Sequence, residues 1–347
     1  MRRAFTLSEL LVVMLILSIL AGLVLVGLSS AVNDARRART RTIIDKVDGL
    51  LAEKWEGYRV RAVPIRLPAG VRPAPEPFTD GNANKTYDVG ESFIDTNGNN
   101  VYDHGAAWVR LLALRETQRV ELPDRISDLC SDSELTDLLA DSKLDAVAGN
   151  VKLVSLTASP SVTNSYRRLM ARCIAGSPPR PWTTEYQGSE CLFLILSCMK
   201  DGDKSALGYF QTAEIGDTDA DGMREILDGW GKPLEWLRWP SGFVRENLAI
   251  TDQTADIRFP DPFDPLRTDG NTYAVRPLIY SAGLDGEYAV ERGVMVYVQP
   301  SFPSPLQPNE LPNDPYLIPT NSPLLVGTPD TSREGWQDNI SNHYHEE

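Results

Sequence analysis

Histidine and cysteine are scarce in this sequence of 347 residues. It has three histidines and four cysteines, and no two cysteines form a C-x-x-C pair, so a zinc site built from these ligands is not expected. The G-x-S-x-G, H-E-x-x-H, P-loop and G-x-G-x-x-G patterns are also absent. Because these patterns place the reactive groups of several common catalytic sites, we expect a protein that is not an enzyme.

Positive charge is also in short supply. Lysine and arginine number 34 against 48 aspartates and glutamates, which gives a formal net charge of −14. Residues 1–61 are the exception, with 10 basic and 6 acidic side chains. No nucleic-acid partner is expected, because phosphate binding needs clustered lysine and arginine.

A long apolar run follows the first nine residues. The 19 residues from Leu10 to Leu28 carry no charge, and as a helix they span about 28 Å, the thickness of a bilayer core. We therefore predict one helix that crosses the lipid bilayer. Glu9 directly precedes the run, and a carboxylate at that depth is costly unless it finds a partner.

The residues R-R-A-F-T-L-S-E-L and the apolar run after them resemble the N-terminal signal of type IV prepilins and type II secretion pseudopilins. The resemblance implies that a prepilin peptidase cuts between Ala4 and Phe5 and methylates Phe5. Ala4 stands where the family usually has glycine. Glu9 then becomes the fifth residue and neutralises the terminal amine of a neighbouring subunit, since paired charges are less costly in lipid than single ones.

The same resemblance implies a location and partners. Residues 1–4 form a leader peptide, and residues 5–28 cross the bacterial inner membrane once with the N-terminus in the cytoplasm. The head then lies in the periplasm or outside the cell. The implied partners are the prepilin peptidase, other pilin or pseudopilin subunits and an inner-membrane assembly platform.

The helix is expected to continue beyond the membrane as an amphipathic stem over residues 29–61. No proline occurs before Pro64, and apolar residues recur at the spacing of one helix face. The residues on this face are Ile43, Ile44, Val47, Leu50, Leu51 and Tyr58. We predict one helix from Phe5 to Tyr58, about 80 Å long, followed by a proline-rich linker over residues 62–78.

Residues 79–298 are expected to form a head of the α+β class, in which the long N-terminal helix packs on a small antiparallel sheet. Helical patterns lie at residues 106–117, 133–147 and 165–176, while residues 190–200 fit a buried helix or a strand. Residues 299–347 hold nine prolines and are predicted to form an extended arm.

Two segments near the C-terminus, D-G-W-G-K-P and Y-S-A-G-L-D-G, resemble the C-terminal β-region of the type II secretion major pseudopilin. The matching residues are Asp228, Trp230, Gly231, Pro233, Tyr280, Ser281, Gly283, Asp285 and Gly286. Since this region binds calcium in that family, the resemblance implies Asp285 as a calcium ligand.

The segment D-T-D-A-D-G-M-R-E-I-L-D has the spacing of a calcium loop. Asp217, Asp219 and Asp221 occupy positions 1, 3 and 5, with Glu225 at position 9 and Asp228 at position 12. This alternation aims several oxygen atoms at one point, which suits Ca²⁺ better than Mg²⁺. The alternative is that these residues simply form a turn.

A repeat of 15 residues offers two further candidate loops, F-T-D-G-N-A-N-K-T-Y-D-V-G-E and F-I-D-T-N-G-N-N-V-Y-D-H-G-A. Their possible calcium ligands are Asp80, Asn82, Asn84 and Asp88 in the first copy and Asp95, Asn97, Asn99 and Asp103 in the second. Turns without an ion are equally compatible with the pattern.

The four cysteines are Cys130, Cys173, Cys191 and Cys198. Their pairing cannot be chosen from the sequence, and buried free thiols are as well supported as disulfides in an exported head.

These features predict a structural filament subunit, pseudopilin-like, of a type II secretion system or a related type IV filament. Two alternatives stay open. One is a minor type IV pilin in adhesion, motility or DNA uptake, and the other is a membrane-anchored calcium-binding surface protein that never polymerises.

Overall fold

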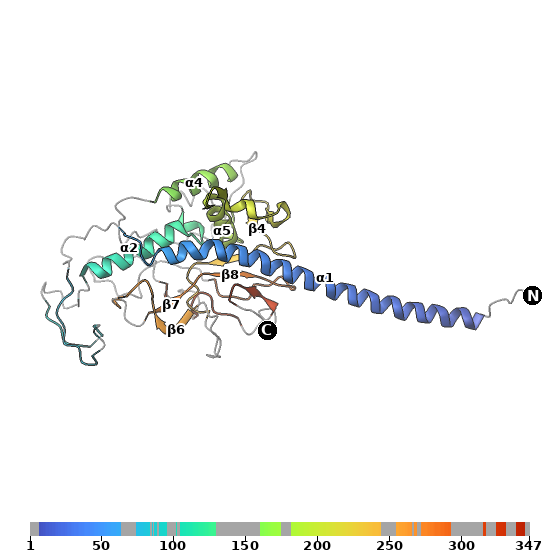
Figure 1. The fold of residues 1–347 in the computed structure, drawn as a ribbon, viewed down its shortest axis with the longest axis horizontal. Helices are drawn as coiled ribbons and strands as arrows, with labels where there is room; N and C mark the ends of the chain where they lie inside the picture. The colour runs from blue at the N-terminus through green and yellow to red at the C-terminus, as the bar shows by residue number, and fades with distance from the viewer. Residues whose placement is uncertain are drawn as a thin grey trace, which may run out of the picture.

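One long helix organises the computed structural model of the chain (Figure 1). This helix, α1, spans Leu7–Gly57, about 76 Å at 1.5 Å per residue, and it confirms the single helix predicted from the sequence. The structure describes residues 7–63, 74–83, 85, 87–88, 90–95, 102, 105–129, 160–174, 182–243, 255–265, 267–268, 272–292, 315–316, 324–330 and 338–343.

The two halves of α1 have different surroundings. The N-terminal half projects from the head, and the C-terminal half runs across it (Figure 1). Ile43, Ile44, Val47 and Leu51 are at most 2 % exposed, as their spacing on one helix face predicts. Trp55 joins them in the core, so the stem helix is part of the head and not a separate spacer.

A second helix, α5, lies at the centre of the head. It spans Gln187–Cys198, and every residue from Gly188 to Leu196 is buried. Because Cys191–Leu196 are all apolar, this part of α5 has apolar side chains on every side and is stable only when it is covered all round. It packs against α4, which spans Ser161–Ile174, and α2 spans Gly105–Glu121. The open choice between helix and strand at residues 190–200 is thus resolved as a helix up to Cys198.

The strands of the head are short, and all of their pairings are antiparallel. A three-stranded sheet has the order β5–β8–β9, formed by Glu235–Leu237, Leu278–Ser281 and Ile340–Ser341. Three further pairs are β1 with β2 (Lys200–Asp201, Lys204–Ser205), β3 with β4 (Ile215–Gly216, Glu225–Ile226) and β6 with β7 (Ala255–Pro260, Tyr273–Val275). Short 3-10 helices occur at Ile126–Asp128, Ala206–Tyr209 and Thr212–Glu214. The architecture is α+β, as predicted.

Strand β9 lies in the segment for which the sequence predicts an extended arm. Ile340 is 7 % exposed and belongs to the main core. The Asn342 side chain donates to Asp48 of α1 at 2.7 Å and accepts from the backbone N–H of Ile279 at 3.0 Å. Residues 338–343 are therefore part of the head, because they fill the core and tie the sheet to α1.

A buried ion network joins α2 to the end of β5. Arg238 lies 2.8 Å from an oxygen of Asp128 and 3.3 Å from an oxygen of Asp124, and Arg119 lies 3.0 Å from Asp128. Burial alone would raise the pKa of Asp124, but Arg125 and Arg238 together hold it well below its usual range. The network fixes α2 beside the sheet through charge pairs that water does not screen.

Candidate functional site

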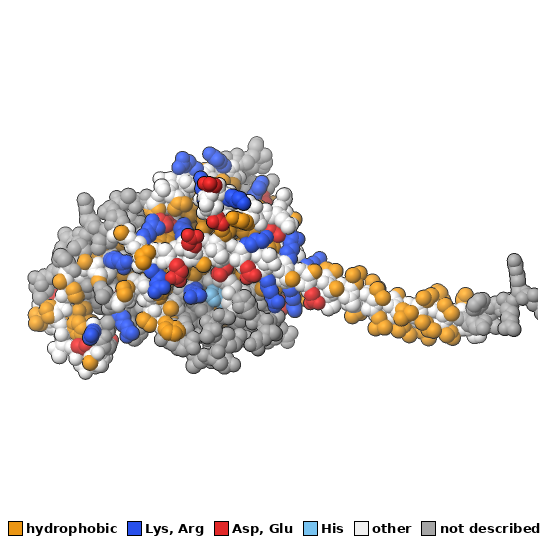
Figure 2. Space-filling view, viewed as in Figure 1, with side chains coloured by type: hydrophobic (Ala, Val, Ile, Leu, Met, Phe, Trp, Pro, Cys, Tyr) orange, Lys and Arg blue, Asp and Glu red, His pale blue; other side chains and the backbone are white. Residues whose placement is uncertain are grey.

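The N-terminal half of α1 is a bare apolar rod (Figure 2). From Leu7 to Val32, every large apolar side chain is at least 42 % exposed. The most apolar 18 residues of the helix have a mean hydropathy of 3.0, and none of them is buried. Ser18 and Ser29 donate their hydroxyls to carbonyl oxygens one turn back, at 2.7 and 2.8 Å. By length, composition and internal hydrogen bonding, this half of α1 can cross a membrane.

The processing residues predicted from the sequence precede this rod. Ala4 and Phe5 lie outside the described residues. Glu9 lies in the first turns of α1, and its side chain is outside the described part.

An acidic cluster lies where α5 meets the turn between β3 and β4. Carboxylate oxygens of Asp217, Asp219 and Glu225 all lie within 4.8 Å of one another. Asp219 also belongs to a second group, with Asp221 and Glu190, whose oxygens meet the same limit. The structure thus brings together four of the five residues predicted as one calcium loop and adds Glu190 of α5.

Hydrogen bonds from within the β3–β4 turn, and one from Thr183, hold two of these carboxylates in place. Asp221 accepts from the backbone N–H groups of Thr183 and Met223 at 2.7 and 2.8 Å. The two oxygens of Glu225 accept from the N–H of Thr218 at 3.2 and 3.1 Å. These bonds fix the positions of the Asp221 and Glu225 carboxylates.

The acidic cluster has an unusual electrostatic character. Burial, reinforced by the charge of Asp221, raises the pKa of Glu190 to about 10. Burial also raises the pKa of Glu225 to about 8, and the backbone hydrogen bond from Thr218 opposes this shift. No lysine or arginine within the described ranges forms an ion pair with Glu190, Asp219, Asp221 or Glu225.

Asp228, predicted at position 12 of the loop, is not a member of either acidic group. Its carboxylate accepts from the backbone N–H groups of Trp230 and Lys232 at 2.8 and 2.9 Å and from the Ser281 hydroxyl. Asp228 therefore closes the D-G-W-G turn and joins it to β8. Asp228 and Ser281, one from each of the two matching C-terminal segments, are thus in direct contact.

Gly229, in the same turn, touches α1 directly. Its N–H donates to the Thr40 hydroxyl at 2.9 Å, and that hydroxyl donates in turn to the carbonyl oxygen of Arg36 at 3.0 Å. A Cβ on Gly229 would lie 2.2 Å from the same carbonyl oxygen. The turn packs against the helix at a distance that only glycine permits.

The 15-residue repeat folds into an aromatic cluster. Tyr87 and Tyr102, which are equivalent in the two copies, stack at 3.9 Å, and Phe78 and Phe93 each meet both tyrosines edge-on at 5.6–5.9 Å. Phe78 and Phe93 also pair as an antiparallel bridge. The repeat thus pairs with itself through its aromatic residues.

The predicted calcium ligands of the repeat are only partly described. Asp80 accepts from the N–H of Lys85 at 2.8 Å, and Asn82 donates to Asp88 at 2.6 Å. Asp95 is partly buried. Asn84, Asn97, Asn99 and Asp103 lie outside the described residues. Calcium binding by this pair of loops stays a prediction.

Asp285 and the cysteines complete the predicted site residues. Asp285 is exposed and is not in either acidic group. Its N–H and that of Leu284 donate to the carboxylate of Asp338, at 3.2 and 2.6 Å, so the turn presents donors to an acid. Among the described cysteines, Cys173, Cys191 and Cys198 are free thiols, and Cys130 lies outside the described part.

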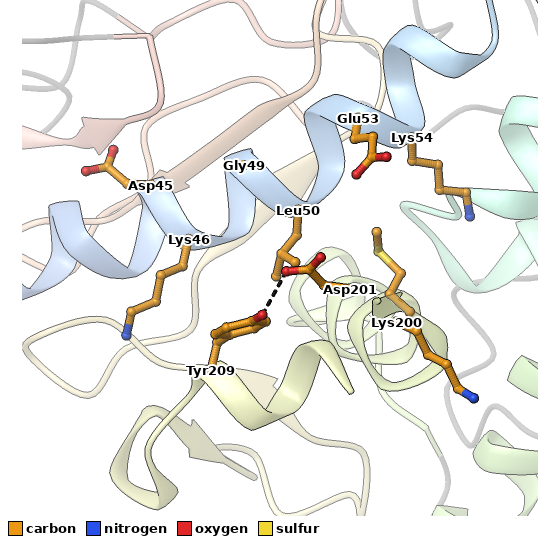
Figure 3. Close-up of a pocket in the computed structure, with 10 residues that line it drawn as sticks. Asp45, Lys46, Gly49, Leu50, Glu53, Lys54, Lys200, Asp201 and Tyr209 are labelled. Atoms are coloured by element: carbon orange, nitrogen blue, oxygen red, sulfur yellow. Dashed lines mark hydrogen bonds between the residues drawn. The ribbon is translucent and has the colours of Figure 1, made fainter. Parts of the chain in front are cut away.

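A cavity of about 650 Å³ lies between α1 and the β1–β2 hairpin (Figure 3). Acidic and basic side chains alternate around it, and Tyr209 donates to Asp201 at 2.7 Å. Burial lowers the pKa of Lys54 at one end of the cavity, although Glu121 opposes this shift. The lining mixes both charges, so the cavity favours neither anionic nor cationic ligands.

Comparison with known proteins bears on the N-terminal segment. The model of the prokaryotic N-terminal methylation motif matches residues 1–25. No curated protein and no solved structure matches the chain. Since the matched residues run directly into the bare half of α1, the chain carries a signal of the type IV prepilin kind ahead of a membrane-length helix. The N-terminal resemblance is confirmed, and the C-terminal one stays a prediction.

Proposed function

We propose that this protein is a structural, non-catalytic subunit of a type II secretion pseudopilus or a related type IV filament. A prepilin peptidase cuts it between Ala4 and Phe5 and methylates the new N-terminus. One observation carries the proposal. The methylation motif leads into a helix whose first half is bare and whose second half packs into the core of the head (Figures 1 and 2).

The bare half of α1 cannot remain in water. It exposes 17 large apolar side chains from Leu7 to Val32. At about 1.5 kcal/mol for each, their exposure costs on the order of 25 kcal/mol. Since a typical domain is stable by only about 5–15 kcal/mol, this segment needs lipid or other helices around it. Lipid provides this before assembly, and neighbouring α1 helices provide it in a filament.

Assembly follows from the same geometry. With the N-terminus in the cytoplasm, the bare half of α1 lies in the inner membrane and the head lies in the periplasm. The Glu9 carboxylate then pairs with the terminal amine of an adjacent subunit, because each charge alone is costly in an apolar medium. Since α1 is continuous into the core, an assembly platform that moves the helix moves the head with it.

Intact-mass and N-terminal peptide analysis of the protein from purified membranes tests the processing step. A chain that begins with N-methyl-Phe5 is the expected result. A chain that still begins with Met1 or Arg2 would contradict the proposal and favour a membrane-anchored protein that does not polymerise.

The assembly step needs a variant with a matched control. We expect Glu9→Gln to be processed normally but to be lost from sheared or purified filaments, because its neutral amide cannot pair with an amine. Asp34→Asn, which removes an exposed acid from the same helix, is expected to assemble like the unmodified protein. Equal incorporation of both variants would rule out the pairing role of Glu9.

A further inference from the structure

A buried carboxylate oxygen in α5 lacks a hydrogen-bond partner among the described residues. Glu190 is 0 % exposed. Its Oε2 accepts from the indole N–H of Trp182, whereas its Oε1 has no hydrogen-bond partner in the described part of the chain. A buried acceptor left unpaired destabilises a fold, and a buried charge does so more strongly. The Glu190 carboxylate reaches into the acidic cluster, where the neighbouring side chains are Asp219 and Asp221.

The other carboxylates in the cluster have lone pairs to spare. Asp219 accepts one hydrogen bond from the Asp221 N–H and one from the Thr183 hydroxyl, and each oxygen of Asp221 accepts one from a backbone N–H. Since every carboxylate oxygen offers two lone pairs, these atoms retain acceptor capacity. Among the described residues, no lysine or arginine forms an ion pair with Glu190, Asp219, Asp221 or Glu225.

We propose that Glu190 of α5 and the acids Asp217, Asp219, Asp221 and Glu225 bind a calcium ion. Ligand oxygens lie at about 2.4 Å from Ca²⁺, so two oxygens on opposite sides of one ion are about 4.8 Å apart. Within each of the two sets of three acids in the cluster, the oxygens meet this limit. The donors are oxygens only, which suits a hard cation and not zinc or copper.

The ion also has a path into the site. Asp217 is exposed, Asp219 is partly exposed and Glu190 is fully buried, so the acids form a graded route from solvent. A bound ion joins Glu190 of the central helix α5 to the β3–β4 turn, whose first acid, Asp217, follows it by 27 positions in the sequence. This role is independent of processing at Ala4 and of filament assembly.

The test uses the full-length protein in detergent micelles, stripped with EDTA. Calcium is expected to raise the melting temperature in a saturable way and to show one binding event by calorimetry. Tb³⁺ is a second probe, because the Trp182 indole, which touches Glu190, can sensitise its emission, and excess calcium should quench that signal by displacement.

Three variants locate the site. Glu190→Gln and Asp219→Asn are expected to weaken calcium binding at least tenfold. Asp203→Asn removes an exposed acid outside the cluster and is expected to bind calcium like the unmodified protein. Circular dichroism checks that each variant folds.

The outcomes separate calcium from its alternatives. Glu190 and Asp221 can instead share a proton, in which case the melting temperature is indifferent to calcium and Glu190→Gln is as stable as the unmodified protein. That result overturns the proposal. Calcium binding that survives both Glu190→Gln and Asp219→Asn also overturns it, as does a response to Mg²⁺ alone.

Discussion

The contact of Gly229 with α1 gives a sharp prediction about how the stem is joined to the head. Gly229→Ala places a methyl group 2.2 Å from the carbonyl oxygen of Arg36, less than van der Waals contact. The backbone of Arg36 is part of a continuous helix and cannot yield locally. The turn must therefore move away, and this movement breaks the hydrogen bond from Gly229 to Thr40.

The magnitude follows from these two effects. Forcing extra volume into a packed contact costs about 1–3 kcal/mol, and a lost hydrogen bond costs about 0.5–1.5 kcal/mol. We expect Gly229→Ala to lower the free energy of unfolding by about 2–3 kcal/mol. For a head of this size, each kcal/mol lowers the melting temperature by about 2–4 °C, so a fall of about 4–12 °C is expected.

Urea denaturation of the full-length protein in micelles, followed by tryptophan fluorescence, measures the change. Gly208→Ala is the matched control, because a Cβ there has nothing within 4 Å. The control is expected to leave stability unchanged or slightly raised. If Gly229→Ala and the control unfold at the same urea concentration, the turn does not pack against α1 as described and the reasoning fails.

Three further predictions concern the head. Arg238→Ala is expected to lower the free energy of unfolding by about 3–5 kcal/mol, because it leaves the buried acids Asp124 and Asp128 without this partner. Arg59→Ala, at an exposed ion pair, is expected to change it by less than about 0.5 kcal/mol. Equal losses of stability in thermal unfolding of the two variants would contradict this. The pKa of Asp124 is held below its unfolded value, so its contribution to stability is present above about pH 4 and is lost on acidification. Urea titrations from pH 6 down to pH 2 should show this loss, with a shallower slope in Asp124→Asn. Burial raises the pKa of the Cys191 thiol, so iodoacetamide mapped by mass spectrometry should modify Cys198 and leave Cys191 intact until the protein unfolds; equal labelling of the native protein would refute the buried placement.

The sequence was most informative where a pattern repeats. The spacing of Ile43, Ile44, Val47 and Leu51 predicts the buried face of α1 because a long helix samples its period many times. The 15-residue repeat is equally visible in the sequence, where its acids and amides suggest calcium loops and its aromatic residues are easily overlooked. The aromatic residues Phe78 and Tyr87 with their equivalents recur at the same spacing, and they make the contact between the copies.

Features that rest on single residues were not predictable in this way. Glu190 stands at the start of an apolar run, where one acid has no periodicity to mark it, and only the fold brings it beside Asp219. Asp228 fits position 12 of a calcium loop by count, but it is followed by G-W-G-K-P. Its carboxylate accepts hydrogen bonds from the backbone N–H groups of this turn instead. Strand β9 has two residues, too few for any alternating pattern.

The tie between Asn342 and Asp48 spans 294 positions of the chain, and it sets an order of events during biosynthesis. α1 is complete after 57 residues and can enter the membrane while the ribosome is still making the head. The three-stranded sheet, however, needs residues 340–341. Because folding tends to proceed from the N-terminal side as the chain emerges, anchoring comes first and closure of the head comes last. A nascent chain that stalls before residue 340 is thus tethered with an open sheet edge, which is a form that quality-control proteases can recognise.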